Sequence, residues 1–101
     1  MSFKTELWIG QDGIFTRTDE KLRDLSVGGA FVECHQVYPI GSVLNFRFKL
    51  PGLSTFVSCS GIVRNMLMGQ GFGVEFLDLS RDNAGIIERK IAENISPSIQ
   101  W

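Results

Sequence analysis

The sequence has few of the residues on which disulfide-bonded proteins, zinc sites and most enzymes depend. Its 101 residues include two cysteines, one histidine and three prolines. Cys34 and Cys59 form no Cys-x-x-Cys pattern, and His35 adjoins only one of them, so the sequence predicts neither a zinc site nor a disulfide framework. We interpret both cysteines as small buried apolar residues of a protein kept reduced in the cytoplasm.

Catalytic groups are also scarce. With one histidine, no carboxylate pair with an evident base and no phosphate-binding loop, the chain offers no nucleophile, acid or base for catalysis. The glycines at positions 69, 71 and 73 do not form a dinucleotide fingerprint, because a strand pattern follows them where that motif requires a helix. We therefore expect a protein that is not an enzyme, with no catalytic residue, no metal ligand and no cofactor.

Long apolar runs and an excess of one charge are missing as well. No apolar run approaches the roughly 18 residues of a membrane-spanning helix, and residues 1–6 lack the features of a signal peptide. Ten basic and eleven acidic residues leave a formal net charge of −1, and no basic track with interleaved exposed aromatics is visible. We expect a soluble cytoplasmic protein that neither inserts into a membrane nor binds a nucleic-acid polymer.

Alternating apolar and polar residues dominate the first three quarters of the chain. From Leu44 to Leu50, leucines and phenylalanines alternate with polar and basic residues, which predicts a strand with one buried and one solvated face. Gly61 interrupts a second alternating segment and predicts a bulge or tight bend there. The further short strands are predicted around residues 4–9, 14–18, 30–33, 55–64 and 72–76.

After residue 79, apolar residues recur at the spacing of a helix, with Ser80 placed to cap its N-terminus and Pro97 to end it. The chain is thus predicted as a single domain over residues 1–101. Six short strands and one helix indicate a mainly β fold built on a small antiparallel barrel, since closure removes exposed sheet edges. The predicted parts are a barrel over about residues 3–77, a helix over about 81–95 and a short apolar tail over 96–101.

The tripeptide Asp-Leu-Ser occurs twice, in different contexts. The copy that ends at Ser80 leads into the helix and is interpreted as its cap. The copy from Asp24 to Ser26 instead precedes Gly28 and Gly29, where no helix can follow. In an extended segment the two polar side chains would point the same way and receive a polar ligand, with the glycines leaving room. The alternative is an Asx-type turn that closes a strand connection.

Residues 24–29, with the sequence DLSVGG, resemble the D-x-S-x-x-G element of PilZ domains. Residues 71–76, with the sequence GFGVEF, are similar to that family's closing G-x-G-V-x-F strand, and the similarity extends over about residues 14–95. The resemblance implies a six-stranded antiparallel PilZ-type β-barrel with one C-terminal α-helix, and binding of the bacterial second messenger cyclic di-GMP. The ligand-binding residues that it implies are Asp24, Ser26, Gly28 and Gly29.

One PilZ element, an R-x-x-x-R sequence just upstream of the first strand, has no counterpart in this chain, whose first 16 residues contain no arginine. In the family these guanidiniums grip the phosphates and stack on the guanines. Losing two such contacts, at about 1.5–3 kcal/mol each, weakens binding on the order of 10²- to 10⁴-fold. Arg17 and Lys21 reproduce the four-residue spacing further downstream. We retain Arg17 and Arg23 as candidate ligand contacts, with solvated surface charge as the alternative.

Two functions follow from these patterns. The first is a cyclic di-GMP-binding signalling module whose binding is weak or atypical because the arginine pair is missing. The alternative is a PilZ-like adaptor that binds no nucleotide and contacts a protein of a signalling, motility or surface-polysaccharide system, with the apolar tail as an anchor. Residues 34–74 contain Arg47, Lys49 and Arg64 but no acidic residue. The strand face that carries Arg47 and Lys49 could therefore meet an anionic ligand or an acidic protein surface, unless it is simply solvated.

Overall fold

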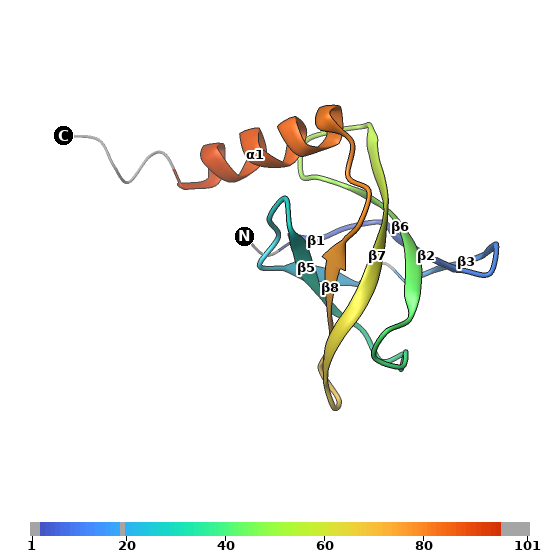
Figure 1. The fold of residues 1–101 in the computed structure, drawn as a ribbon. Helices are drawn as coiled ribbons and strands as arrows, with labels where there is room; N and C mark the ends of the chain where they lie inside the picture. Colours follow the sequence, from blue (N-terminus) through green and yellow to red (C-terminus); the bar gives the residue numbers. More distant parts are fainter. Residues whose placement is uncertain (1–2, 19, 96–101) are drawn as a thin grey trace.

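The computed structural model describes residues 3–18 and 20–95, which form eight β-strands and one α-helix (Figure 1). The elements are β1 (Phe3–Lys4), β2 (Leu7–Gln11), β3 (Ile14–Arg17), β4 (Lys21–Arg23), β5 (Gly29–Glu33), β6 (Val43–Lys49), β7 (Phe56–Leu67), β8 (Gly71–Phe76) and α1 (Arg81–Ile95).

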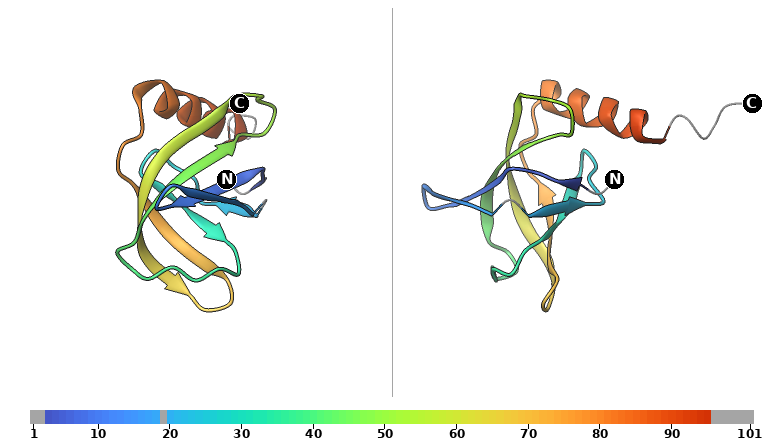
Figure 2. Two further views of the ribbon diagram at one scale, coloured as in Figure 1. Left: turned by 90° about the vertical axis from the view of Figure 1, so that its right-hand side faces the viewer. Right: turned by 180° about the vertical axis from the view of Figure 1, so that it is seen from behind.

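The strands form one antiparallel sheet in the order β1-β4-β5-β8-β7-β6-β2-β3. Only Thr5 and Glu6 separate β1 from β2, yet these strands lie near opposite ends of that order. The sheet therefore curls until its ends approach, as the views in Figure 2 show. Thr5 secures the closure, because its hydroxyl donates to the Lys49 carbonyl at 2.6 Å and accepts from the Lys49 amide at 3.1 Å. The predicted class, a mainly β antiparallel barrel with a C-terminal helix, is confirmed.

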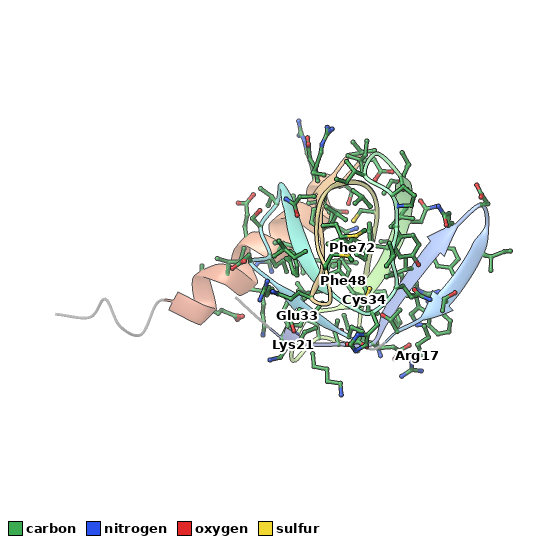
Figure 3. All side chains as sticks on the ribbon, turned by 90° about the horizontal axis from the view of Figure 1, so that it is seen from below. Arg17, Lys21, Glu33, Cys34, Phe48 and Phe72 are labelled. Carbon is green, nitrogen blue, oxygen red and sulfur yellow. The ribbon has the colours of Figure 1, made fainter. Side chains whose placement is uncertain are left out.

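The interior of the curled sheet is filled by the apolar residues that alternate along its strands. In β6, Leu44, Phe46 and Phe48 are buried while the residues between them are exposed, as the alternation predicted. Phe48 and Phe72 lie in the middle of the barrel (Figure 3). Burying such a side chain stabilises the fold by about 1.5–3 kcal/mol.

Both cysteines are free and buried, as predicted. Burial raises the pKa of the Cys34 thiol above its ordinary value. Burial, with a smaller effect of the nearby Asp78 carboxylate, raises the pKa of Cys59 to about 12. Both thiols therefore remain protonated at neutral pH. Neither supplies the thiolate that a reactive cysteine requires.

Helix α1 lies across one end of the barrel (Figures 1 and 2). Its N-terminus is capped as predicted, because the Ser80 hydroxyl accepts the Asn83 amide at 3.1 Å, a contact worth about 1 kcal/mol. Ile87 is fully buried, and Ile86 and Ile91 pack against the core. Within the described residues no helix has the length and apolar character needed to cross a membrane. The predicted stop at Pro97 and the predicted apolar tail lie outside the described residues.

The described strands number eight rather than the predicted six. The strand predicted around residues 4–9 is divided into β2 and the two-residue β1, and the three-residue β4 has no counterpart in the prediction. Segments this short contain too few residues to show a period of two. They nevertheless matter for the architecture, because β1 pairs with β4 and β4 with β5 at one end of the sheet.

The bulge predicted at Gly61 is wrong. Gly61 pairs regularly with Leu44 on one side and Phe76 on the other. A Cβ atom at this position would lie 3.0 Å from the Phe46 ring and 3.2 Å from a backbone oxygen, so close packing favours a glycine here. The register shift of β7 falls instead between Val63 and Asn65.

Candidate ligand-binding groove

The connection between β4 and β5 is a tight turn centred on Asp24 and Ser26. Asp24 has a φ of 54°, in the left-handed region that Asp tolerates better than most residues. The Ser26 amide donates to the Gly29 carbonyl at 2.9 Å, and the Ser26 hydroxyl accepts the Gly28 amide at 3.1 Å. The extended conformation predicted for this segment is therefore wrong. A turn is present, as the alternative predicted, but Ser26 closes it and the aspartate of an Asx-type turn does not.

The two glycines of this turn serve different purposes. A Cβ atom on Gly29 would fall 2.0 Å from the Val74 carbonyl oxygen, so no side chain fits where β5 pairs with β8. A Cβ atom on Gly28 would meet only the Ser26 hydroxyl at 3.7 Å, an ordinary contact. Gly29 is thus required by the sheet, whereas Gly28 borders open space above the turn.

That open space is a shallow groove of about 360 Å³ between the Asp24 turn and strands β7 and β8. Arg64 and Asn65 line it from β7 at the point where the register of that strand shifts, so that Arg64 has no partner in the ladder. The Asn65 side-chain oxygen accepts the Gly73 amide at 3.1 Å and holds the shifted strand in place. The lining residues are Asp24, Ser26, Gly28, Gly29, Ala30, Phe31, Arg64, Asn65, Gly73, Val74 and Glu75.

The charged groups around the groove differ in their availability. Among the described residues, the Asp24 carboxylate has neither a hydrogen-bond donor nor a cation as partner. Arg64 donates to Glu75 at 2.8 Å, and these side chains are 55% and 52% exposed. A pair this exposed is typically worth no more than about 1 kcal/mol, so Arg64 can exchange Glu75 for another anion at small cost. The groove thus offers one free carboxylate and one exchangeable guanidinium.

The comparisons with known proteins identify the family. The family model of the PilZ domain matches residues 9–93. The chain belongs to the PilZ domain family. PilZ domains are cyclic di-GMP-binding signalling modules, and the family consists of binding and adaptor modules rather than enzymes. The predicted family membership is therefore confirmed.

A solved structure supports the fold of this PilZ domain. The inhibitor of motility of Bacillus subtilis (MotI/DgrA) is similar with a TM-score of 0.72 and 16% sequence identity. The match covers 94% of this chain and 49% of that one, so this PilZ domain spans about half the length of the solved chain. No curated protein matches the chain.

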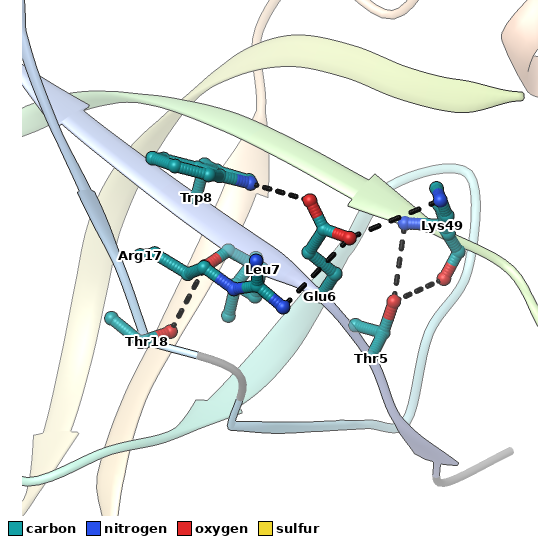
Figure 4. Close-up of polar contacts among 7 residues, drawn as sticks. All are labelled: Thr5, Glu6, Leu7, Trp8, Arg17, Thr18 and Lys49. Carbon is teal, nitrogen blue, oxygen red and sulfur yellow. Dashed lines mark hydrogen bonds and ion pairs between the residues drawn. The ribbon is translucent and has the colours of Figure 1, made fainter.

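The structure does not bring Arg17 to the groove of this PilZ domain. Arg17 ends β3, where its guanidinium lies 3.9 Å from the Glu6 carboxylate and 5.9 Å from the centroid of the Trp8 ring (Figure 4). In Figure 3, Arg17 is well separated from Lys21, so the four-residue spacing of these two residues does not produce a joint phosphate clamp. The sequence spacing was misleading because the chain changes strands between them.

Arg23 lies closer to the PilZ groove but outside its lining. Its guanidinium stacks over the Phe31 ring at 4.2 Å and lies 3.7 Å from the Glu33 carboxylate. Phe31 itself lines the groove, so Arg23 borders the site through this ring. The residues that sequence reasoning missed at the site are Arg64 and Asn65. In the sequence, Arg64 stands out only as one cation of a segment without acidic residues, and no local pattern indicates that a strand irregularity places it opposite Asp24.

Proposed function

We propose that this PilZ domain is a cyclic di-GMP-binding signalling module whose ligand occupies the groove between the Asp24 turn and Arg64. The observation that carries the proposal is the unpartnered Asp24 carboxylate, held at the rim of an open groove by a left-handed backbone. A carboxylate accepts hydrogen bonds from the N–H edge of guanine. Gly28 leaves space for the base, and Arg64 supplies a guanidinium for a phosphate.

Binding is proposed to be weak. The ligand is a dianion, whereas the groove is lined by a single arginine, and that arginine is already paired with Glu75. Arg23 beside it is likewise paired with Glu33. Two further bidentate arginine contacts would add about 1.5–3 kcal/mol each, and this chain lacks the element that carries them in the family. We infer that the module acts in the cytoplasm, where a second messenger reaches its receptors.

The decisive experiment is calorimetric titration of the full chain with cyclic di-GMP, comparing wild type with Asp24→Asn and Asp12→Asn. Asp12 is a matched control, because it also has a φ of 54° but lies in the turn between β2 and β3. We expect weak saturable heat for wild type and Asp12→Asn, and a loss of about tenfold or more in affinity for Asp24→Asn.

Two outcomes would contradict the proposal. Equal binding by both variants would move the ligand away from the Asp24 turn. No heat at near-millimolar ligand would reject the receptor function and favour the second candidate, an adaptor for a protein partner of a signalling, motility or surface-polysaccharide system. The observation that favours this candidate is that both arginines near the groove are already neutralised by glutamates.

A further inference from the structure

The outer face of strands β2, β3, β6 and β7 carries a cluster of basic and aromatic residues away from the groove. The sheet register defines it, because Trp8 on β2 lies opposite Arg17 on β3 and opposite Arg47 on β6. Two residues beyond Arg47 on β6, Lys49 lies opposite Phe56 on β7. Directly opposed residues of an antiparallel sheet project from the same face. We call these five residues the cationic face.

Cations of the cationic face lie over its own aromatic rings. The Arg47 guanidinium lies 4.4 Å from the centroid of the Phe56 ring, and the Lys49 ammonium lies 4.8 Å from the same centroid. Arg17 lies 5.9 Å from the Trp8 centroid. Each such contact is worth about 0.5–1 kcal/mol at an exposed site and restricts a long side chain that would otherwise sample many rotamers. The face therefore presents partly ordered positive charges.

Glu6 is a carboxylate that contacts three residues of this face. It accepts the Trp8 indole N–H at 3.0 Å and lies 3.9 Å from both Arg17 and Lys49 (Figure 4). Asp78 lies at the far edge beside Arg47, but it accepts hydrogen bonds from the Ser60 amide and hydroxyl.

Positive charge is locally in excess on the cationic face. Arg47 has no ion-pair partner among residues 3–18 and 20–95, and the three cations together with Glu6 and Asp78 carry a formal sum of +1. With a net charge of −1 for the whole chain, the remaining residues sum to −2. The face is thus a positive surface on an otherwise acidic protein, so the attraction that it exerts is local.

We propose that the cationic face binds an acidic segment of a partner protein. Guanidinium groups form bidentate contacts with carboxylates, and Arg47 is free to do so. Single-stranded nucleic acid is a poorer fit, since base stacking needs open ring faces and cations already lie over these rings. The cationic face shares no residue with the Asp24 groove, so this inference does not depend on nucleotide binding.

Fluorescence anisotropy with a labelled peptide of about ten glutamates tests the inference on the full chain. We expect saturable, salt-sensitive binding that falls about tenfold in the double variant Arg47→Gln/Lys49→Gln, as expected for two exposed ion pairs of up to about 1 kcal/mol each. The control is Arg81→Gln/Arg89→Gln, which removes the same charge from exposed positions of α1 and should change affinity less than about twofold. Heats of cyclic di-GMP binding should be the same in both double variants.

A charge-neutral variant separates this surface from general electrostatics. Phe56→Leu keeps all cations but removes the ring beneath Arg47 and Lys49, and we expect about a threefold loss of peptide affinity. Phe31→Leu, which removes the ring beneath Arg23 on another part of the sheet, is the control and should leave peptide binding unchanged. Equal losses in the two double variants, or absence of saturable peptide binding, would overturn the inference. Tighter binding of an oligothymidine of equal length would overturn it in favour of nucleic acid.

Discussion

Asp24 and Ser26 are two residues apart, but the fold uses them differently. The Ser26 hydroxyl is occupied by the Gly28 amide, which closes the turn, whereas the Asp24 carboxylate stays available. The D-x-S-x-x-G element was recognisable from the sequence because its residues are contiguous. Its opposite wall was not, because Arg64 and Asn65 reach the groove only through a register shift between two long strands.

Cys59 gives a prediction at this same scale. Its pKa is raised to about 12 in the folded protein, from an ordinary value of 9.0, mainly because the thiol is buried. The unfolded chain therefore releases the thiol proton first as pH rises, and stability present below about pH 9 should decline above it, by at most about 1.4 kcal/mol per pH unit. Urea unfolding of wild type and Cys59→Ala between about pH 8 and pH 11 measures this, since only wild type carries the effect. Parallel pH profiles for the two proteins would reject it.

At the scale of secondary-structure elements, the sequence pattern predicted the long elements correctly. The alternation of β6 and the capped start of α1 both appear as predicted, because each is determined by residues near in sequence. The role predicted for Gly61 in β7 was wrong. This glycine packs closely against the Phe46 ring on a neighbouring strand and does not mark a bend in its own strand. The short strands β1 and β4 depend almost entirely on their neighbours in the sheet.

The pairing of β5 with β8 can be tested through the two glycines of the Asp24 turn. Gly29→Ala would place a Cβ atom 2.0 Å from the Val74 oxygen, so the strands must separate, at a cost of about 1–3 kcal/mol. Gly28→Ala meets only an ordinary 3.7 Å contact and should change stability by less than about 0.5 kcal/mol. Urea denaturation of both variants provides the comparison, and similar stabilities would show that this ladder tolerates separation.

At the scale of the whole molecule, two residues close the barrel. Thr5 and Glu6 carry the chain from β1 to β2, and the Thr5 hydroxyl makes two hydrogen bonds with the backbone of Lys49. The barrel class was predictable from strand number and short turns. The site of closure was not, because it depends on which distant strand ends meet.

Thr5→Val tests this closure with little change of shape. Loss of two hydrogen bonds, with the Lys49 amide left without its acceptor, should lower the free energy of unfolding by about 1–3 kcal/mol. Thr16→Val is the matched control, since Thr16 is exposed on β3 and makes no side-chain hydrogen bond among the described residues. Thermal and urea unfolding are the measurements. An effect no larger than that of the control would assign the closure to apolar packing instead.

Strand β7 is shared by the two proposed binding surfaces. Phe56 at its start belongs to the cationic face, and Arg64, eight positions later, lines the groove. At about 3.3 Å per residue the two positions lie roughly 26 Å apart along the strand. A nucleotide and an acidic protein segment could therefore occupy the domain together without steric conflict. In a ternary complex of this kind, any cooperativity between the two ligands would have its most direct covalent route through β7.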